Sequence, residues 1–122
     1  MATRSMTKTD VSTAYDFGWV VSWTGLTNTT SDDGSPAEMF GGADRSVQVH
    51  GTFGTNGTCL IEGSNDGTNY YTLTDFQGNA LSITSAKVDS IAEITRYVRP
   101  RISNGDGSTS LTVTIMMRRP QR

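Results

Sequence analysis

Cysteine is almost absent from this chain of 122 residues, in which Cys59 is the one thiol. A single thiol excludes an internal disulfide, and with it the class of small disulfide-stapled secreted domains, and it leaves no thiolate-based zinc site. The chain also lacks the run of about 18 apolar residues that spans a membrane, and residues 1–11 lack the apolar stretch of a secretory signal. We therefore expect a soluble protein made in the cytoplasm, with no membrane partner.

Groups that could carry out catalysis are equally scarce. The single histidine, His50, lies between Val49 and Gly51, and the alternation of the strand predicted there turns it outward. No serine, acid or thiol accompanies it in a recognisable motif. Cys59 has no basic neighbour in sequence to lower its pKa, which favours a packed thiol. We expect no enzyme activity and no catalytic residues.

Metal ligands and cofactor motifs are missing as well. Two acidic sets, Asp32 and Asp33 with Glu38, and Asp66 with Asp75, do not have the spacing of an EF-hand, and acidic residues in turns usually serve turn geometry. The 13 glycines lie in predicted hairpins rather than between a strand and a helix, so no phosphate-binding loop is indicated. The isoelectric point near 5.2 does not suit a nucleic-acid binder. We expect no metal, no cofactor and no direct nucleic-acid partner.

The chain is rich in threonine, serine and glycine, and this composition favours strands joined by turns. Apolar residues recur at every second position, the period of a strand with one buried face, most clearly at Phe17, Trp19, Val21 and Trp23. The predicted strands are residues 17–23, 47–53, 59–62, 70–74, 81–84, 96–103 and 111–117. Short strands at this spacing predict an all-β fold, an antiparallel β-sandwich or jelly roll of seven to eight strands with an extended N-terminal arm.

The remaining segments give the expected domain boundaries. Residues 1–14 are polar and lack periodicity, so we expect a flexible N-terminal arm, then a single β-sandwich domain at 15–117 and a basic C-terminal tail at 118–122. Within the domain, residues 28–44 predict a long loop, and residues 85–95 predict at most one helical turn. An eighth strand could lie in the arm or in the loop.

Two single residues make sharper local predictions. Gly25 is expected to end the first strand of the domain. Pro100 lacks a backbone N–H group to donate to a ladder, so its strand is expected at a sheet edge or with a bulge at that point.

The aromatic residues leave two interpretations open. Trp19 and Trp23 share a strand face with other apolar residues, which favours a place in the core. The alternative is a sugar-stacking platform formed by Trp19, Trp23, Tyr70, Tyr71 and Tyr97. Tyr70 or Tyr71 must point outward if their strand alternates.

Charge is distributed unevenly along the chain. Residues 1–95 contain 4 basic and 11 acidic residues, whereas residues 96–122 contain 6 arginines and one aspartate. Such separation can produce docking onto an acidic neighbour or head-to-tail contact between copies. The alternative is that strands from distant parts of the chain mix these charges in space.

Several motifs carry a resemblance to a known family. Residues 62–73 read EGSNDGTNYYTL, a QGN turn follows at 77–79, and YVRP at 97–100 precedes NGDGST at 104–109 and a last alternating strand. With these motifs, residues 46–119 resemble the head decoration, or cement, proteins of tailed bacteriophages, which have a jelly-roll or related β-sandwich fold. The resemblance implies a non-enzymatic virion protein that binds the outer surface of the capsid, as a dimer or trimer, and stabilises joints between major capsid protein subunits.

This reading implies partners, a location and contact residues. The expected partners are the major capsid protein and further copies of this chain, and the expected location is the outer capsid surface of the virion, after synthesis in the host bacterial cytoplasm. The alternative function is a carbohydrate- or receptor-binding module of a phage tail or baseplate. The candidate capsid-contact residues, from the arm, the long loop and the tail, are Arg4, Lys8, Asp32, Asp33, Met39, Phe40, Arg118, Arg119 and Arg122.

Overall fold

The computed structural model describes residues 2–10, 18–28, 32–39 and 42–118, which form strands and no helix. The strands are β1 (Thr3–Arg4), β2 (Thr7–Asp10), β3 (Gly18–Thr27), β4 (Asp33–Gly34), β5 (Ala37–Glu38), β6 (Ala43–Thr52), β7 (Thr58–Ser64), β8 (Tyr71–Thr72), β9 (Ser82–Ile83), β10 (Lys87–Ser90), β11 (Tyr97–Asn104) and β12 (Ser110–Arg118). Among the described residues, no helix is long and apolar enough to cross a membrane.

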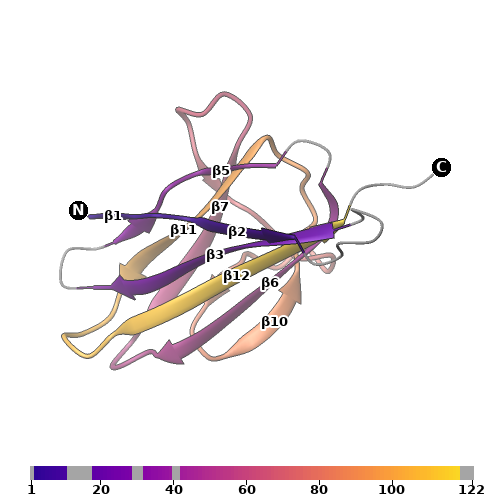
Figure 1. Ribbon diagram of the computed structural model, residues 1–122. Coiled ribbons are helices and arrows are strands. Elements are labelled where there is room, and N and C mark those ends of the chain that lie inside the picture. The colour runs from indigo at the N-terminus through magenta and orange to yellow at the C-terminus, as the bar shows by residue number, and fades with distance from the viewer. Residues whose placement is uncertain (1, 11–17, 29–31, 40–41, 119–122) are drawn as a thin grey trace.

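The strands form two sheets that pack face to face (Figure 1). The five-stranded sheet has the order β10-β6-β12-β3-β2. The seven-stranded sheet has the order β1-β4-β11-β7-β8, with β5 also paired to β11 and β9 also paired to β7. The predicted all-β sandwich is therefore confirmed, with more and shorter strands than the alternation indicated.

The centre of the five-stranded sheet contains a bulge that the sequence did not reveal. β3 continues past Gly25, so the prediction that a strand ends there is wrong. Thr24 and Gly25 lie between two regular stretches of β3, where the register against β12 shifts between Leu111 and Val113. Gly25 has a φ of 67°, a conformation that glycine adopts without strain. The extra residue turns Leu26 back into the core, where it is fully buried.

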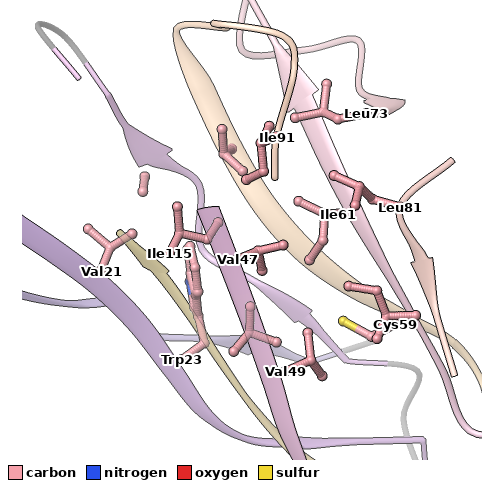
Figure 2. Close-up of a cluster of buried hydrophobic side chains, with 14 of the residues drawn as sticks. Val21, Trp23, Val47, Val49, Cys59, Ile61, Leu73, Leu81, Ile91 and Ile115 are labelled. Atoms are coloured by element: carbon pink, nitrogen blue, oxygen red, sulfur yellow. The ribbon is translucent and has the colours of Figure 1, made fainter. Parts of the chain in front are cut away.

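The hydrophobic core lies between the sheets and draws on both (Figure 2). Trp23 and Val47 come from the five-stranded sheet, and Cys59 and Ile61 from the seven-stranded sheet. All four side chains are fully buried. Burial of this apolar surface is the main source of stability for such a domain, and it determines which side chains of each strand point into the core.

Pro100 lies in the middle of a sheet, so its predicted edge position is wrong. β11 pairs with β7 on one side, regularly at this point, and on the other side with β5 at Val98 and with β4 at Arg101. On that second side the Ile102 N–H donates to the carbonyl of Asp32 at 2.8 Å. Because the backbone repeats every two residues, Pro100 turns its nitrogen to the same side. The nitrogen of Pro100 therefore points between β4 and β5, where no strand pairs with β11 and no backbone donor is required.

The N-terminal residues join both sheets. β1 runs parallel to β4 in the seven-stranded sheet, and β2 runs antiparallel to β3 in the five-stranded sheet. The Asp33 N–H donates to the carbonyl of Ala2 at 3.0 Å and extends the first of these pairings. The sandwich thus reaches into residues 1–14, the segment expected to be an arm, whereas residues 11–14 lie outside the described residues.

Two other segments contain strands in place of the expected structures. The loop expected at 28–44 includes β4 and β5, both of which pair with β11. Residues 85–95, predicted to form at most one helical turn, contain a strand and no helix: β10 pairs with β6, and the Ile91 N–H donates to the carbonyl of Arg45 at 3.0 Å. Of the expected basic tail, residues 119–122 lie outside the described residues.

Candidate functional site

The residues predicted to contact a capsid, as far as the structure describes them, do not gather on one surface. Asp32, Asp33 and Met39 are 0%, 3% and 2% exposed, respectively. A side chain buried to this degree offers almost no surface to a partner, which argues against a direct contact role for these three. Outside the described residues lie Phe40, Arg119 and Arg122.

Arg4 and Asp32 lie together in the structure. The Arg4 Nε donates to Asp32 Oδ2 at 2.7 Å, and the same oxygen accepts hydrogen bonds from the Thr27 backbone N–H at 2.9 Å and hydroxyl at 3.1 Å. Charge-assisted hydrogen bonds of this length are strong. This carboxylate therefore fastens the N-terminal segment to the end of β3, and Arg4 has a structural role.

Glu62 joins two arginines on the outer face of the seven-stranded sheet. Its Oε1 accepts from Arg99 Nε at 3.1 Å and its Oε2 from Arg101 Nε at 3.0 Å. Arg99 Nη1 also lies 3.4 Å from a carboxylate oxygen of Asp33. The ring of Tyr70 covers the Arg99 guanidinium, whose carbon lies 3.9 Å from the ring centroid. These contacts tie β4, β7 and β11 together through side chains.

The arginines of the C-terminal part that the structure describes are therefore paired with acidic residues from earlier in the chain. Arg96 binds Glu38 at 3.1 Å and Arg118 binds Asp44 at 2.6 Å, in addition to the pairs made by the arginines of β11. The structure supports the interpretation in which distant strands mix their charges in space. The arginines of this segment that the structure describes therefore do not form a patch of unpaired positive charge.

Of the predicted contact residues that the structure describes, Lys8 and Arg118 leave the most surface open to a partner. Lys8 is exposed on the edge strand β2, with its ammonium 5.4 Å from the centroid of the Trp19 ring. The Arg118 side chain is 65% exposed at the end of β12. His50, on the outward side of β6, is exposed as predicted.

One edge of the sandwich exposes large apolar side chains that sequence reasoning missed. Phe76, Val88 and Ile94 are 70%, 64% and 66% exposed, and we name these three residues the apolar rim. The Phe76 N–H donates to Ser90 Oγ at 3.0 Å, which holds the turn after β8 against the end of β10. Val88, Ile91 and Ile94 are three residues apart, a spacing typical of one face of a helix. Because of this spacing, the exposure of Val88 and Ile94 was not predicted.

A cleft of about 590 Å³ lies beside the apolar rim. Its lining comes from the end of β7, the following turn, β8 with Leu73, and the two residues that flank Ile94, namely Glu93 and Thr95. A Cβ at Gly63 would lie 2.6 Å from Thr95 Oγ1 and 2.8 Å from Leu73 Cδ2, so glycine is needed for the close packing of the lining. Most lining side chains are polar, and Tyr71, 72% exposed, adds an aromatic ring.

Metal-binding side chains do not converge in the described part of the chain. No group of three or more His, Cys, Asp or Glu residues with the geometry of a metal site occurs there. The candidate functional surfaces of the described residues are thus the apolar rim and the cleft beside it.

Cys59 is expected to be unreactive in the folded protein. Its side chain is fully buried, and desolvation raises the pKa of the thiol to about 12. Because the thiolate is the reactive form, we expect a disulfide reagent at pH 8 to label native protein at least about a hundredfold more slowly than unfolded protein. Stopped labelling followed by mass spectrometry measures both rates, and equal rates would contradict the packed position.

No protein-family model matches the chain, and no curated protein matches it in sequence. A solved structure does share its architecture. The crystal structure of the SPBc2 prophage-derived protein YomS is similar with a TM-score of 0.59 and 14% sequence identity, over 83% of this chain and 94% of that chain. At this identity the similarity shows a common fold alone.

Proposed function

We propose that this chain is a non-enzymatic structural protein of a phage virion, which binds the outer surface of the capsid and stabilises joints between major capsid protein subunits. The observation that carries the proposal is the apolar rim along one edge of the sandwich. The fold shared with a prophage-derived protein supports a phage origin. The family resemblance of residues 46–119 supports the decoration role.

The apolar rim has the properties of a docking surface. Phe76, Val88 and Ile94 are each more than half exposed, and the bond from the Phe76 N–H to Ser90 Oγ holds the turn that carries Phe76 beside β10, the strand of Val88. Exposed apolar clusters on soluble domains mark sites that a partner covers. Covering each of these side chains on a partner contributes about 1.5 to 3 kcal/mol, before the costs of association are subtracted.

β10 adds backbone groups to this surface. The Ile91 N–H donates to the carbonyl of Arg45 in β6. In an antiparallel ladder every second residue bonds to the neighbouring strand, so the N–H and C=O groups of Val88 point away from β6. β10 is the end strand of its sheet, so a strand of a neighbouring subunit can pair there. Lys87 and Asp89 form an ion pair at 3.2 Å on either side of Val88, and such charged side chains on an end strand discourage indiscriminate strand pairing.

Weak docking by each copy is sufficient for this role. A capsid presents the same joint many times, and copies that associate as a dimer or trimer bind several joints at once, so their contacts accumulate avidity. The proposed partners are accordingly the major capsid protein and further copies of this chain, on the outer surface of the virion.

The proposal is tested on particles that lack this protein. Purified wild-type protein is added back, its copies per particle are counted by mass spectrometry, and its position is located by cryo-electron microscopy. We expect many copies distributed over the outer shell. The double variant Phe76→Ser with Ile94→Ser removes apolar surface from the rim and is expected to reduce occupancy at least about tenfold.

The matched control is Met116→Ser, which removes a 45% exposed apolar side chain from β12, the central strand of the five-stranded sheet. Its occupancy should equal that of the wild type, and thermal unfolding confirms that all variants fold. A wild-type protein found in a few copies at the tail would overturn the capsid proposal. Unchanged occupancy of the double variant would show that the rim is not the docking surface.

A further inference from the structure

The cleft beside the apolar rim has the size and composition of a small-ligand site. Its volume of about 590 Å³ falls within the range of pockets that hold small molecules. Most of its lining residues carry a side-chain amide, hydroxyl or carboxylate, and carbon atoms of the same residues contribute the rest of the exposed lining. A ligand that fits this lining carries many hydroxyl groups.

The polar groups of the cleft are held in place by the surrounding structure. Asp66 Oδ1 accepts hydrogen bonds from the backbone N–H groups of Thr68 and Asn69, both at 2.8 Å, and from the Ser64 hydroxyl at 2.9 Å. Its other oxygen accepts from the Asn69 side-chain amide at 2.8 Å. The turn after β7 is thereby fixed, so a ligand would bind it without ordering a mobile loop.

The opposite side of the lining is equally well held. Glu93 Oε1 accepts from the Thr74 backbone N–H at 2.8 Å, and its Oε2 accepts from the Thr74 hydroxyl. Each carboxylate oxygen has a second lone pair with which to accept from a ligand hydroxyl. The Asn65 carbonyl accepts from the Arg96 N–H at 3.0 Å, which orients the Asn65 NH2 group as a donor. The cleft thus presents oriented donors and acceptors.

Tyr71 supplies an apolar surface beside these polar groups. Its ring is 72% exposed and lines the cleft. A sugar ring has hydroxyl groups around its edge and C–H groups on its faces, so it needs polar partners and a flat apolar partner together. An exposed tyrosine beside amide and carboxylate side chains meets both needs.

The charge of the cleft selects among sugars. Asp66 and Glu93 line it, and no lysine or arginine side chain does. Two carboxylates without a cation repel anionic ligands such as sialic or uronic acids. From this juxtaposition we propose that the cleft formed by Asn65, Asp66, Tyr71 and Glu93 binds a neutral saccharide. This binding is a second activity of the chain, separate from attachment through the apolar rim.

The proposal is tested with the purified full chain and defined neutral trisaccharides, namely maltotriose, cellotriose and triacetylchitotriose. Saturation-transfer NMR detects binding and isothermal titration measures the dissociation constant. We expect saturable binding of at least one of them. Tyr71→Ala should then raise its dissociation constant about tenfold or more, because the stacking surface is lost. Asn65→Asp keeps the acceptor for Arg96 but removes the donor, and should also weaken binding.

The matched control is Phe76→Ala, which removes an aromatic ring of similar exposure from outside the cleft. Its saccharide binding should equal that of the wild type. Failure of all three trisaccharides to bind would overturn the proposal, and so would equal losses in Tyr71→Ala and Phe76→Ala. Tighter binding of 3′-sialyllactose than of the neutral sugars would contradict the charge selection. None of these outcomes bears on capsid attachment, which depends on the rim.

Discussion

Replacing Trp23 with alanine is expected to lower the free energy of unfolding by about 3 to 5 kcal/mol. Trp23 is fully buried at the centre of the core, and its indole N–H donates to the carbonyl of Ser35 at 2.9 Å. A Cβ on Gly34 would lie 2.7 Å from the indole ring, so the backbone of β4 packs directly on it. Alanine would leave a cavity and an unpaired carbonyl. Urea denaturation followed by circular dichroism measures the loss.

Trp23→Phe is the matched control for this prediction. Phenylalanine retains most of the aromatic volume but cannot donate to Ser35, so we expect a loss of about 1 to 2 kcal/mol. The difference between the two variants then reports the cavity. If the free energy of unfolding of Trp23→Ala is within about 1 kcal/mol of the wild-type value, Trp23 does not point into the core and β4 does not pack on it.

The sandwich could be predicted from the sequence because its main signal is local. Val47 and Val49 of β6, like Leu111 and Val113 of β12, alternate with polar residues, and burial of one sheet face requires that pattern. The position of Pro100 was predicted wrongly because the deciding signal is not local. Its effect on a strand depends on the neighbouring strand, which here is interrupted opposite the proline, and no local pattern shows the interruption.

The surfaces available to partners were harder to predict than the fold. Asp32 and Asp33 lie in a segment of turn-forming residues, a context that favours exposure, yet both are buried. Their burial depends on Arg4, which is 28 residues from Asp32, and on Arg99, which is 66 residues from Asp33. A buried carboxylate is tolerated where such partners converge, and convergence over these distances is a property of the tertiary structure.

Replacing Glu62 with alanine is expected to lower the free energy of unfolding by about 2 to 3 kcal/mol. The Glu62 side chain is 6% exposed and accepts from both Arg99 and Arg101, whose side chains are 22% and 36% exposed. Its removal leaves two partly desolvated guanidinium groups without their shared carboxylate. Because water still reaches the arginines, the expected loss is smaller than for a fully buried pair. Chemical denaturation at pH 7 measures it.

The matched control is Glu38→Ala, because Glu38 also pairs with an arginine, Arg96, from the C-terminal part of the chain. Both side chains of that pair are nearly half exposed, at 44% and 45%, so its loss should cost less than about 1 kcal/mol. Added salt should diminish this small loss further but leave most of the loss in Glu62→Ala, since screening acts mainly on exposed charges. Equal losses in the two variants would show that the cluster around Glu62 is an ordinary surface ion pair. A larger and salt-resistant loss in Glu62→Ala would show that it holds β7 and β11 together, the two strands that lead into the cleft.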